Sequence, residues 1–223
     1  MTMTFKNDVV MNDDVITDYA AGNLSPAKHV MLACQSEISE AVAERVAFQE
    51  DVAASMIEDS DGEALSPLFM GNVLAALPPQ EPANDSDVKE SIKGLAPKSL
   101  RHMLGHGLQD MKWKSLIPGI AVYDILGNRK TKDGDRLYLL KAKGGMKMPD
   151  HGHNGEEWTL ILTGSYTTGN KRFSRGDLHI EGEDEIHAPH IDEGEDCICL
   201  VMTQGPLKMQ GWLPKMVQGV VGI

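Results

Sequence analysis

The spacing of apolar residues changes partway along the chain. Before residue 90, apolar residues recur every three or four positions, the spacing of an amphipathic helix. After residue 90, short apolar runs are separated by glycine-rich turns, which is typical of antiparallel strands. The pattern therefore predicts two domains: an all-α domain over residues 1–90, including a linker, and an all-β domain over residues 91–223.

Start signals divide the helical part into several segments. The pair Asn12-Asp13 predicts the start of a first helix. Ser25 followed by Pro26 predicts a second start, because serine caps free amide groups and proline has no amide to leave unpaired. No proline or glycine interrupts the pattern from Ala27 to Ile57, so this stretch forms either one long helix or two.

A short amphipathic helix is expected after Ser66 and Pro67, which repeat the same start signal. Its apolar residues are candidates for binding a partner: Leu68, Phe69, Val73, Leu74 and Leu77. They fit either the core of the domain itself or an apolar groove in another protein, and the pattern leaves both open. Two prolines then end the helix, and residues 78–91 are expected to form the linker.

The second part is expected to fold as an antiparallel sandwich or barrel. Its apolar runs predict strands at 121–126, 137–142, 158–162 and 197–203, and a short helix at 97–105 precedes them.

Charge narrows the classes of function. The chain has 223 residues and a net charge of −12, and residues 1–90 alone carry 17 acidic and 4 basic residues, net −13. Such acidity repels the phosphates of nucleic acids and favours a basic protein partner. No apolar run approaches the roughly 20 residues that cross a bilayer. The absence of a signal-peptide pattern and the presence of only three cysteines predict a cytoplasmic protein.

A candidate metal site lies in the second part, which contains seven of the eight histidines. Residues two apart on a strand share a face, so His151 and His153 present both imidazoles to one side. Glu157 lies four positions after His153, so it is expected on the same face of the strand. Nitrogen and oxygen donors of this kind bind zinc, iron, manganese or nickel, and a fourth ligand would complete the site.

The spacing from Gly145 through these three residues to Gly164 resembles the first motif of the cupin superfamily. Counting the second cupin motif from Gly176 places His187 at the fourth metal ligand, although Gly182 and Asp184 replace the proline and glycine of that motif. The resemblance implies a small β-barrel, a double-stranded β-helix, that binds one divalent metal through His151, His153, Glu157 and His187.

Four further residues are expected near the site. His179 and His190 follow the motif closely, and we expect each to be structural more often than a ligand. Cys197 and Cys199 share one strand face, where a buried thiol usually acts as a small apolar group. A redox role near the metal is the less favoured interpretation of the two cysteines.

Four segments, together with the order of an acidic helical domain and then a cupin, resemble the ChrR family of anti-sigma factors. They are residues 18–22, 65–77, 116–120 and 196–200. The resemblance covers nearly the whole chain. It implies that the helical domain sequesters an extracytoplasmic-function sigma factor, and that a zinc-bearing cupin is needed for release under oxidative stress, typically by singlet oxygen.

One departure from this family concerns a second zinc site that such helical domains usually contain. Aligned on residues 19–22, three ligand positions fall on Gln35, Ser39 and Val42, and the fourth falls near Asn12. Only His29 and Cys34 are nearby, and five residues apart on a helix they point about 140° from each other. We therefore expect no zinc site in the helical domain.

Two other interpretations stay open. In the first, the protein is a metal-dependent cupin enzyme similar to a dioxygenase, and the helical part serves for homodimerisation. In the second, the chain is a regulator that no longer binds a sigma factor.

Overall fold

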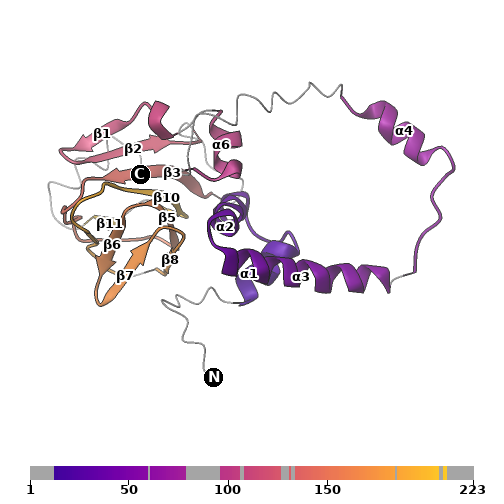
Figure 1. Cartoon of the computed structure of the whole chain (residues 1–223), viewed down its shortest axis with the longest axis horizontal. Coiled ribbons are helices and arrows are strands. Elements are labelled where there is room, and N and C mark those ends of the chain that lie inside the picture. The colour runs from indigo at the N-terminus through magenta and orange to yellow at the C-terminus, as the bar shows by residue number, and fades with distance from the viewer. Residues whose placement is uncertain are drawn as a thin grey trace.

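The computed structural model places a group of helices against one face of a large antiparallel sheet (Figure 1). It describes residues 13–59, 61–78, 96–105, 108–126, 131, 134–183, 185–205 and 208–209. The expected linker falls almost wholly outside these residues. No helix in the described part is long and apolar enough to cross a membrane.

The helices follow the start signals in the sequence. They are α1 (Asp13–Ala20), α2 (Pro26–Ile38), α3 (Glu40–Glu58), α4 (Phe69–Ala76) and α6 (Lys98–Leu104), with a 3₁₀ turn, η1, at Leu108–Asp110. The Ser25 side chain accepts a hydrogen bond from the Lys28 amide at the start of α2, as predicted. Residues 27–57, which were expected to form either one helix or two, form two helices, because Ser39 adopts an extended conformation between α2 and α3.

The strands form three antiparallel sheets. The largest has the order β1 (Lys114–Ile117), β2 (Ile120–Asp124), β3 (Arg136–Ala142), β10 (Cys197–Thr203), β5 (Glu157–Thr163) and β8 (Leu178–Glu181). A second has the order β7 (Lys171–Ser174), β6 (Ser165–Thr168) and β9 (His190–Ile191), and β11 (Lys208–Met209) pairs with β4 (His151–Gly152). The all-β prediction for this part is confirmed, while closure into a barrel stays a prediction.

The central strands are buried on both faces. On β5, Trp158, Leu160 and Leu162 belong to a core shared with the helices, whereas Ile161 belongs to a second core between the large and the three-stranded sheet. All seven residues of β5 are buried. Because side chains alternate along a strand, one strand contacts the helical layer with one face and lines the sheet interior with the other.

The helical layer packs directly on the sheet. Met31, Leu32 and Cys34 of α2 share a core with residues of β3, β5 and β10. Three polar contacts also link the two parts: Ser25 Oγ donates to Asp135 Oδ2 at 2.5 Å, Lys28 Nζ lies 2.6 Å from Glu156 Oε2, and Gln35 Nε2 donates to the Gly176 carbonyl at 3.1 Å. Helix α4, by contrast, lies apart from the other elements (Figure 1).

Candidate metal centre

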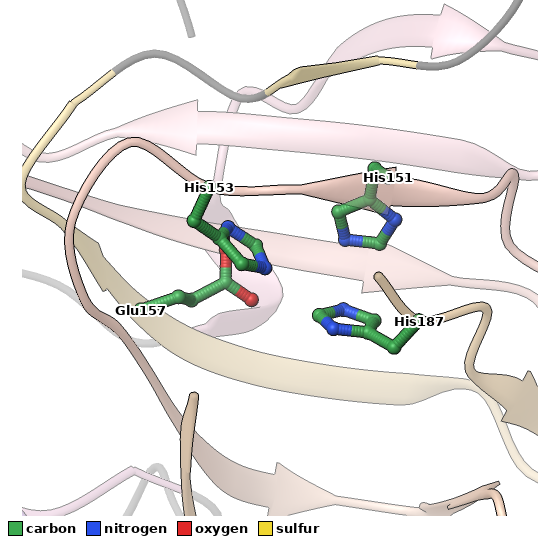
Figure 2. A group of neighbouring side chains, drawn as sticks. All are labelled: His151, His153, Glu157 and His187. Carbon is green, nitrogen blue, oxygen red and sulfur yellow. The ribbon is translucent and has the colours of Figure 1, made fainter. Parts of the chain in front are cut away.

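Backbone pairing brings the predicted ligands together. The amides of His151 and His187 each donate to the other's carbonyl, at 3.1 and 3.0 Å, so the two residues face each other across an isolated antiparallel bridge. His153 follows β4, and Glu157 is the first residue of β5 on the face opposite Trp158. Segments far apart in the sequence thus supply four side chains to one point (Figure 2).

The four side chains form a compact cluster. One donor atom from each of His151, His153, Glu157 and His187 lies within 4.8 Å of the others. The first three are buried and His187 is partly buried. Two of the rings are in close contact, with 4.2 Å between the centroids of His151 and His187. Three imidazoles and one carboxylate at this separation can hold a divalent metal ion.

Some buried nitrogens in the cluster have no hydrogen-bond partner among the described residues. They are Nδ1 and Nε2 of His153, whereas Nδ1 of His187 contacts the carboxylate of Glu181. His153 Nδ1 lies 3.2 Å from Glu157 Oε2, but the two groups are not aligned as a hydrogen bond. Buried polar atoms are usually paired, so an imidazole left without a hydrogen bond inside this cluster fits a bound cation.

Burial sets the protonation of these ligands. It lowers the pKa of His153 to about 4, with His151 and His187 acting in the same direction, and it also lowers the pKa of His151. These imidazoles are therefore neutral at pH 7, the form that binds metals. Burial raises the pKa of Glu157 to about 7, Glu181 adds to this effect, and His187 opposes it.

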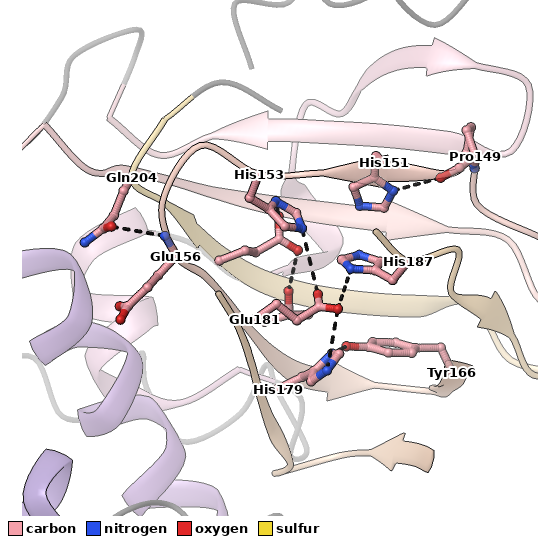
Figure 3. Close-up of polar contacts among 11 residues, drawn as sticks. Pro149, His151, His153, Glu156, Tyr166, His179, Glu181, His187 and Gln204 are labelled. Carbon is pink, nitrogen blue, oxygen red and sulfur yellow. Dashed lines mark hydrogen bonds and ion pairs between the residues drawn. The ribbon is translucent and has the colours of Figure 1, made fainter. Parts of the chain in front are cut away.

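Sequence reasoning missed Glu181, a buried carboxylate beside the cluster. Its Oε2 lies 3.9 Å from His153 Nε2, and its Oε1 contacts His187 Nδ1 (Figure 3). The alternation of side chains along a strand could have indicated Glu181, because it lies two positions after His179 on β8 and shares its face. The family motif names four ligands only, so it gave no reason to look for a second carboxylate.

The near-site candidates separate into two groups. His179 lies close to the cluster, where its Nδ1 is 2.9 Å from the Tyr166 hydroxyl and its ring stacks on Phe173. His190 is exposed, with its backbone paired to Thr167 and Lys147, and it lies outside the cluster.

Cys197 and Cys199 line a cavity that also contacts His151, Glu157 and His187. Both thiols are buried, and their sulfur atoms are 3.5 Å apart. The cavity has a volume of about 40 Å³, which accommodates water-sized molecules only.

Comparisons with known proteins give the family. Residues 102–208 match the family model described as the ChrR cupin-like domain. The anti-sigma-E factor ChrR of Cereibacter sphaeroides is 33% identical over 222 residues, covering 97% of this chain and 98% of that protein. The chain belongs to the ChrR family of anti-sigma factors. A crystal structure of Rhodobacter sphaeroides SigE in complex with the anti-sigma ChrR matches with a TM-score of 0.72 and 30% identity, covering 90% of this chain and 100% of that chain.

Within this ChrR-family chain, the positions aligned with the second zinc site have other contacts. Gln35 is buried and bonds to the Gly176 carbonyl, Ser39 separates α2 from α3, and Val42 lies in the core. Of the two nearby residues, His29 stacks on Tyr19 and Cys34 is a buried core residue. Burial raises the pKa of Cys34 to about 12, which disfavours the thiolate form that binds zinc.

Proposed function

We propose that this protein is an anti-sigma factor of the cytoplasm. Its helical part sequesters an extracytoplasmic-function sigma factor, and its metal-bearing cupin releases that factor in response to an oxidant or a ligand. The observation that carries the proposal is the whole-chain match: the similarity to the Cereibacter ChrR covers both the helices and the sheets, at 97% of this chain.

Helix α4 is the proposed contact for the sigma factor. Apolar side chains in this helix and at its two ends are exposed, with Leu68 at 71%, Leu74 at 61% and Leu77 at 60%, and neither described core includes them. The helix has no charged residue, so water solvates it poorly and an apolar groove would accept it. These residues, with Phe69 and Val73, thus favour a partner over the domain's own core.

Charge supports the choice of partner. Residues 1–90 carry a net charge of −13 from 17 acidic and 4 basic residues. A protein that binds DNA and RNA polymerase presents basic surfaces, and complementary charge speeds its association with an acidic domain.

Strand β5 provides a route from the metal centre to the helices. Glu157 faces the cluster, while its neighbour Trp158 packs in the core shared with α2. Lys28 of α2 lies 5.0 Å above the Trp158 ring and 2.6 Å from Glu156, and the Trp158 indole donates to the same Glu156 carboxylate at 3.2 Å. A shift of β5 at the centre therefore moves the surface on which α2 rests.

Zinc is the metal we propose for the centre. Three imidazoles and one carboxylate match its preferred donors, and four ligands give its usual coordination number. Bound there, it would tie β4 and β5 to the His187 segment. Oxidation or displacement of one ligand would loosen these connections, and a coupling free energy of ~1–3 kcal/mol would change sigma-factor occupancy by 5-fold to 150-fold.

The geometry disfavours the alternative of a cupin enzyme that is similar to a dioxygenase. Pockets for organic substrates usually measure about 300–1,000 Å³. The cavity at the cluster measures about 40 Å³, and apolar side chains such as Leu140 and Ile191 line it. A small oxidant fits this space, whereas a diketone substrate does not.

Co-expression with the cognate sigma factor tests the proposal. The full chain should co-purify with the sigma factor, and Leu74→Asp should weaken the complex at least 10-fold, because a carboxylate enters an apolar contact. Met103→Asp places the same charge on α6, at a side chain exposed to 42%, and serves as the control that should still bind. A wild-type chain that fails to co-purify and leaves the sigma factor fully active would refute the proposal.

A further inference from the structure

Glu181 connects the metal centre to a chain of buried polar groups. Its carboxylate is 5% exposed, and it has histidine neighbours on several sides. Besides its contact with His187 Nδ1, its Oε1 lies 3.7 Å from His179 Nε2. His179 is held in turn by Tyr166 (Figure 3). The chain therefore runs from Tyr166 through His179 and Glu181 to His187.

The contact with His187 is made through one specific nitrogen. Because Nδ1 faces the Glu181 carboxylate, the tautomer with its proton on Nδ1 can donate to that carboxylate, and Nε2 then keeps its lone pair. His151 has the same arrangement, since its Nδ1 lies 2.8 Å from the Pro149 carbonyl. In both rings an oxygen acceptor at Nδ1 leaves Nε2 as the nitrogen available to a metal ion.

The charges of the cluster agree with this arrangement. Glu157 and Glu181 are buried at 6% and 5% exposure, and both lie near the imidazole of His153. A divalent cation bound between them would offset the cost of burying two carboxylates in one site. Without such a cation, burying two carboxylates in one site is unfavourable.

We propose that Glu181 is a positioning residue of the metal centre, which orients His187 by accepting its Nδ1–H so that Nε2 is presented to the cation. This inference rests on the metal-binding part of the proposed function. It assigns a role to a residue outside the four-ligand cluster, and it explains why a carboxylate is buried there.

Metal titration of the full chain tests the proposal. Zinc affinity is measured by competition with a chromogenic chelator for the wild type, for Glu181→Gln, and for Glu195→Gln, which removes an equal charge at an exposed site. Loss of an outer-shell partner typically weakens metal binding 10-fold to 100-fold, so we expect that loss for Glu181→Gln and none for Glu195→Gln. Equal affinity for wild type and Glu181→Gln would overturn the role of Glu181.

Two readouts separate positioning from general destabilisation. In the zinc-loaded wild type, nitrogen NMR of the imidazoles should show His187 protonated at Nδ1 and bound through Nε2; binding through Nδ1 would overturn the proposal. In cobalt-substituted protein, Glu181→Gln should shift the visible absorption bands, because the orientation of His187 changes. If Glu181→Gln does not fold, the same zinc titration is carried out on Glu181→Asp, for which we expect the zinc affinity to fall about 10-fold.

The same titration distinguishes the two levels of the argument. A wild-type chain that binds neither zinc nor cobalt would refute the metal centre itself and Glu181's role with it. A wild-type chain that binds zinc, with Glu181→Gln unchanged, would refute only the role of Glu181.

Discussion

At the scale of single residues, Glu157 combines two opposite roles. It contributes the only carboxylate of the four-residue cluster, and it lies in a buried position where a negative charge is unfavourable unless a cation is near. Its hydrogen bond from Thr159 at 3.2 Å offsets part of this effect. The residue is therefore suited to bind a metal and destabilising when no metal is bound.

The pH dependence of stability follows from this position. Below pH 4.5, the ordinary pKa, the carboxyl group is protonated in both folded and unfolded protein; the folded pKa is about 7. As pH rises between these two values, only the unfolded chain loses the proton, so the free energy of unfolding falls by up to ~3 kcal/mol and then levels off.

Glu157→Gln should therefore stabilise the metal-free protein at pH 8 and change it little at pH 4.5. Urea unfolding in the presence of a chelator measures the difference in the free energy of unfolding between the two proteins. The lowered pKa of His153 makes stability rise with pH, but this contribution is the same in both proteins. An equal change of stability at both pH values would contradict the assignment. The variant should also bind zinc more weakly, because an amide oxygen is a poorer ligand than a carboxylate.

At the scale of elements, the turn after β5 depends on one glycine. Gly164 has a φ of +67°, and an added Cβ would lie 2.8 Å from the Asp196 carbonyl oxygen and 2.9 Å from Cys197 Cα. Both atoms belong to the backbone at the start of β10, which pairs with β5. The residue thus allows the close approach that keeps β5, and Glu157 with it, in register.

Gly164→Ala should destabilise the protein by about 2–5 kcal/mol, since it adds a backbone clash to a left-handed conformation. Gly169→Ala is the matched control, with a φ of +57° and no atom within 4 Å of the added Cβ, and it should cost about 1–2 kcal/mol. Thermal or urea unfolding of the two variants measures the difference, and similar losses would argue against the role of close packing.

At the scale of the whole molecule, the helices and the sheet share one core. Ile16, Met31 and Leu32 pack with Leu139, Leu160 and Leu200, so the helical layer rests on the outer face of the large sheet. A continuous apolar core transmits small displacements, because close-packed side chains cannot move independently. This packing gives a physical basis for communication between the cluster and the helical part.

Removal of the metal should therefore increase the local dynamics of α2. We expect hydrogen exchange of the full chain to accelerate on addition of a chelator in residues 151–163, and also in α2, which packs on Trp158. Exchange in α1, whose contacts are mainly with α3, should change less. Acceleration confined to the cluster would contradict the proposed route through β5.

Much of the site could be predicted from the sequence, because its information is local. The parity of His151 and His153, the spacing to Glu157 and the family motif at His187 led to the four side chains that the fold brings together. The helix starts at Asp13 and Pro26 were equally accessible, since capping and proline chemistry act within one turn.

Tertiary structure decided what depends on contacts between distant segments. It placed Glu181 beside His187, joined Lys28 to Glu156, and set the helical layer on the outer face of β5. It also left the α4 side chains exposed, which the apolar pattern alone had left open. A periodic pattern shows that a face is apolar, but only the packing of the whole chain determines what covers that face.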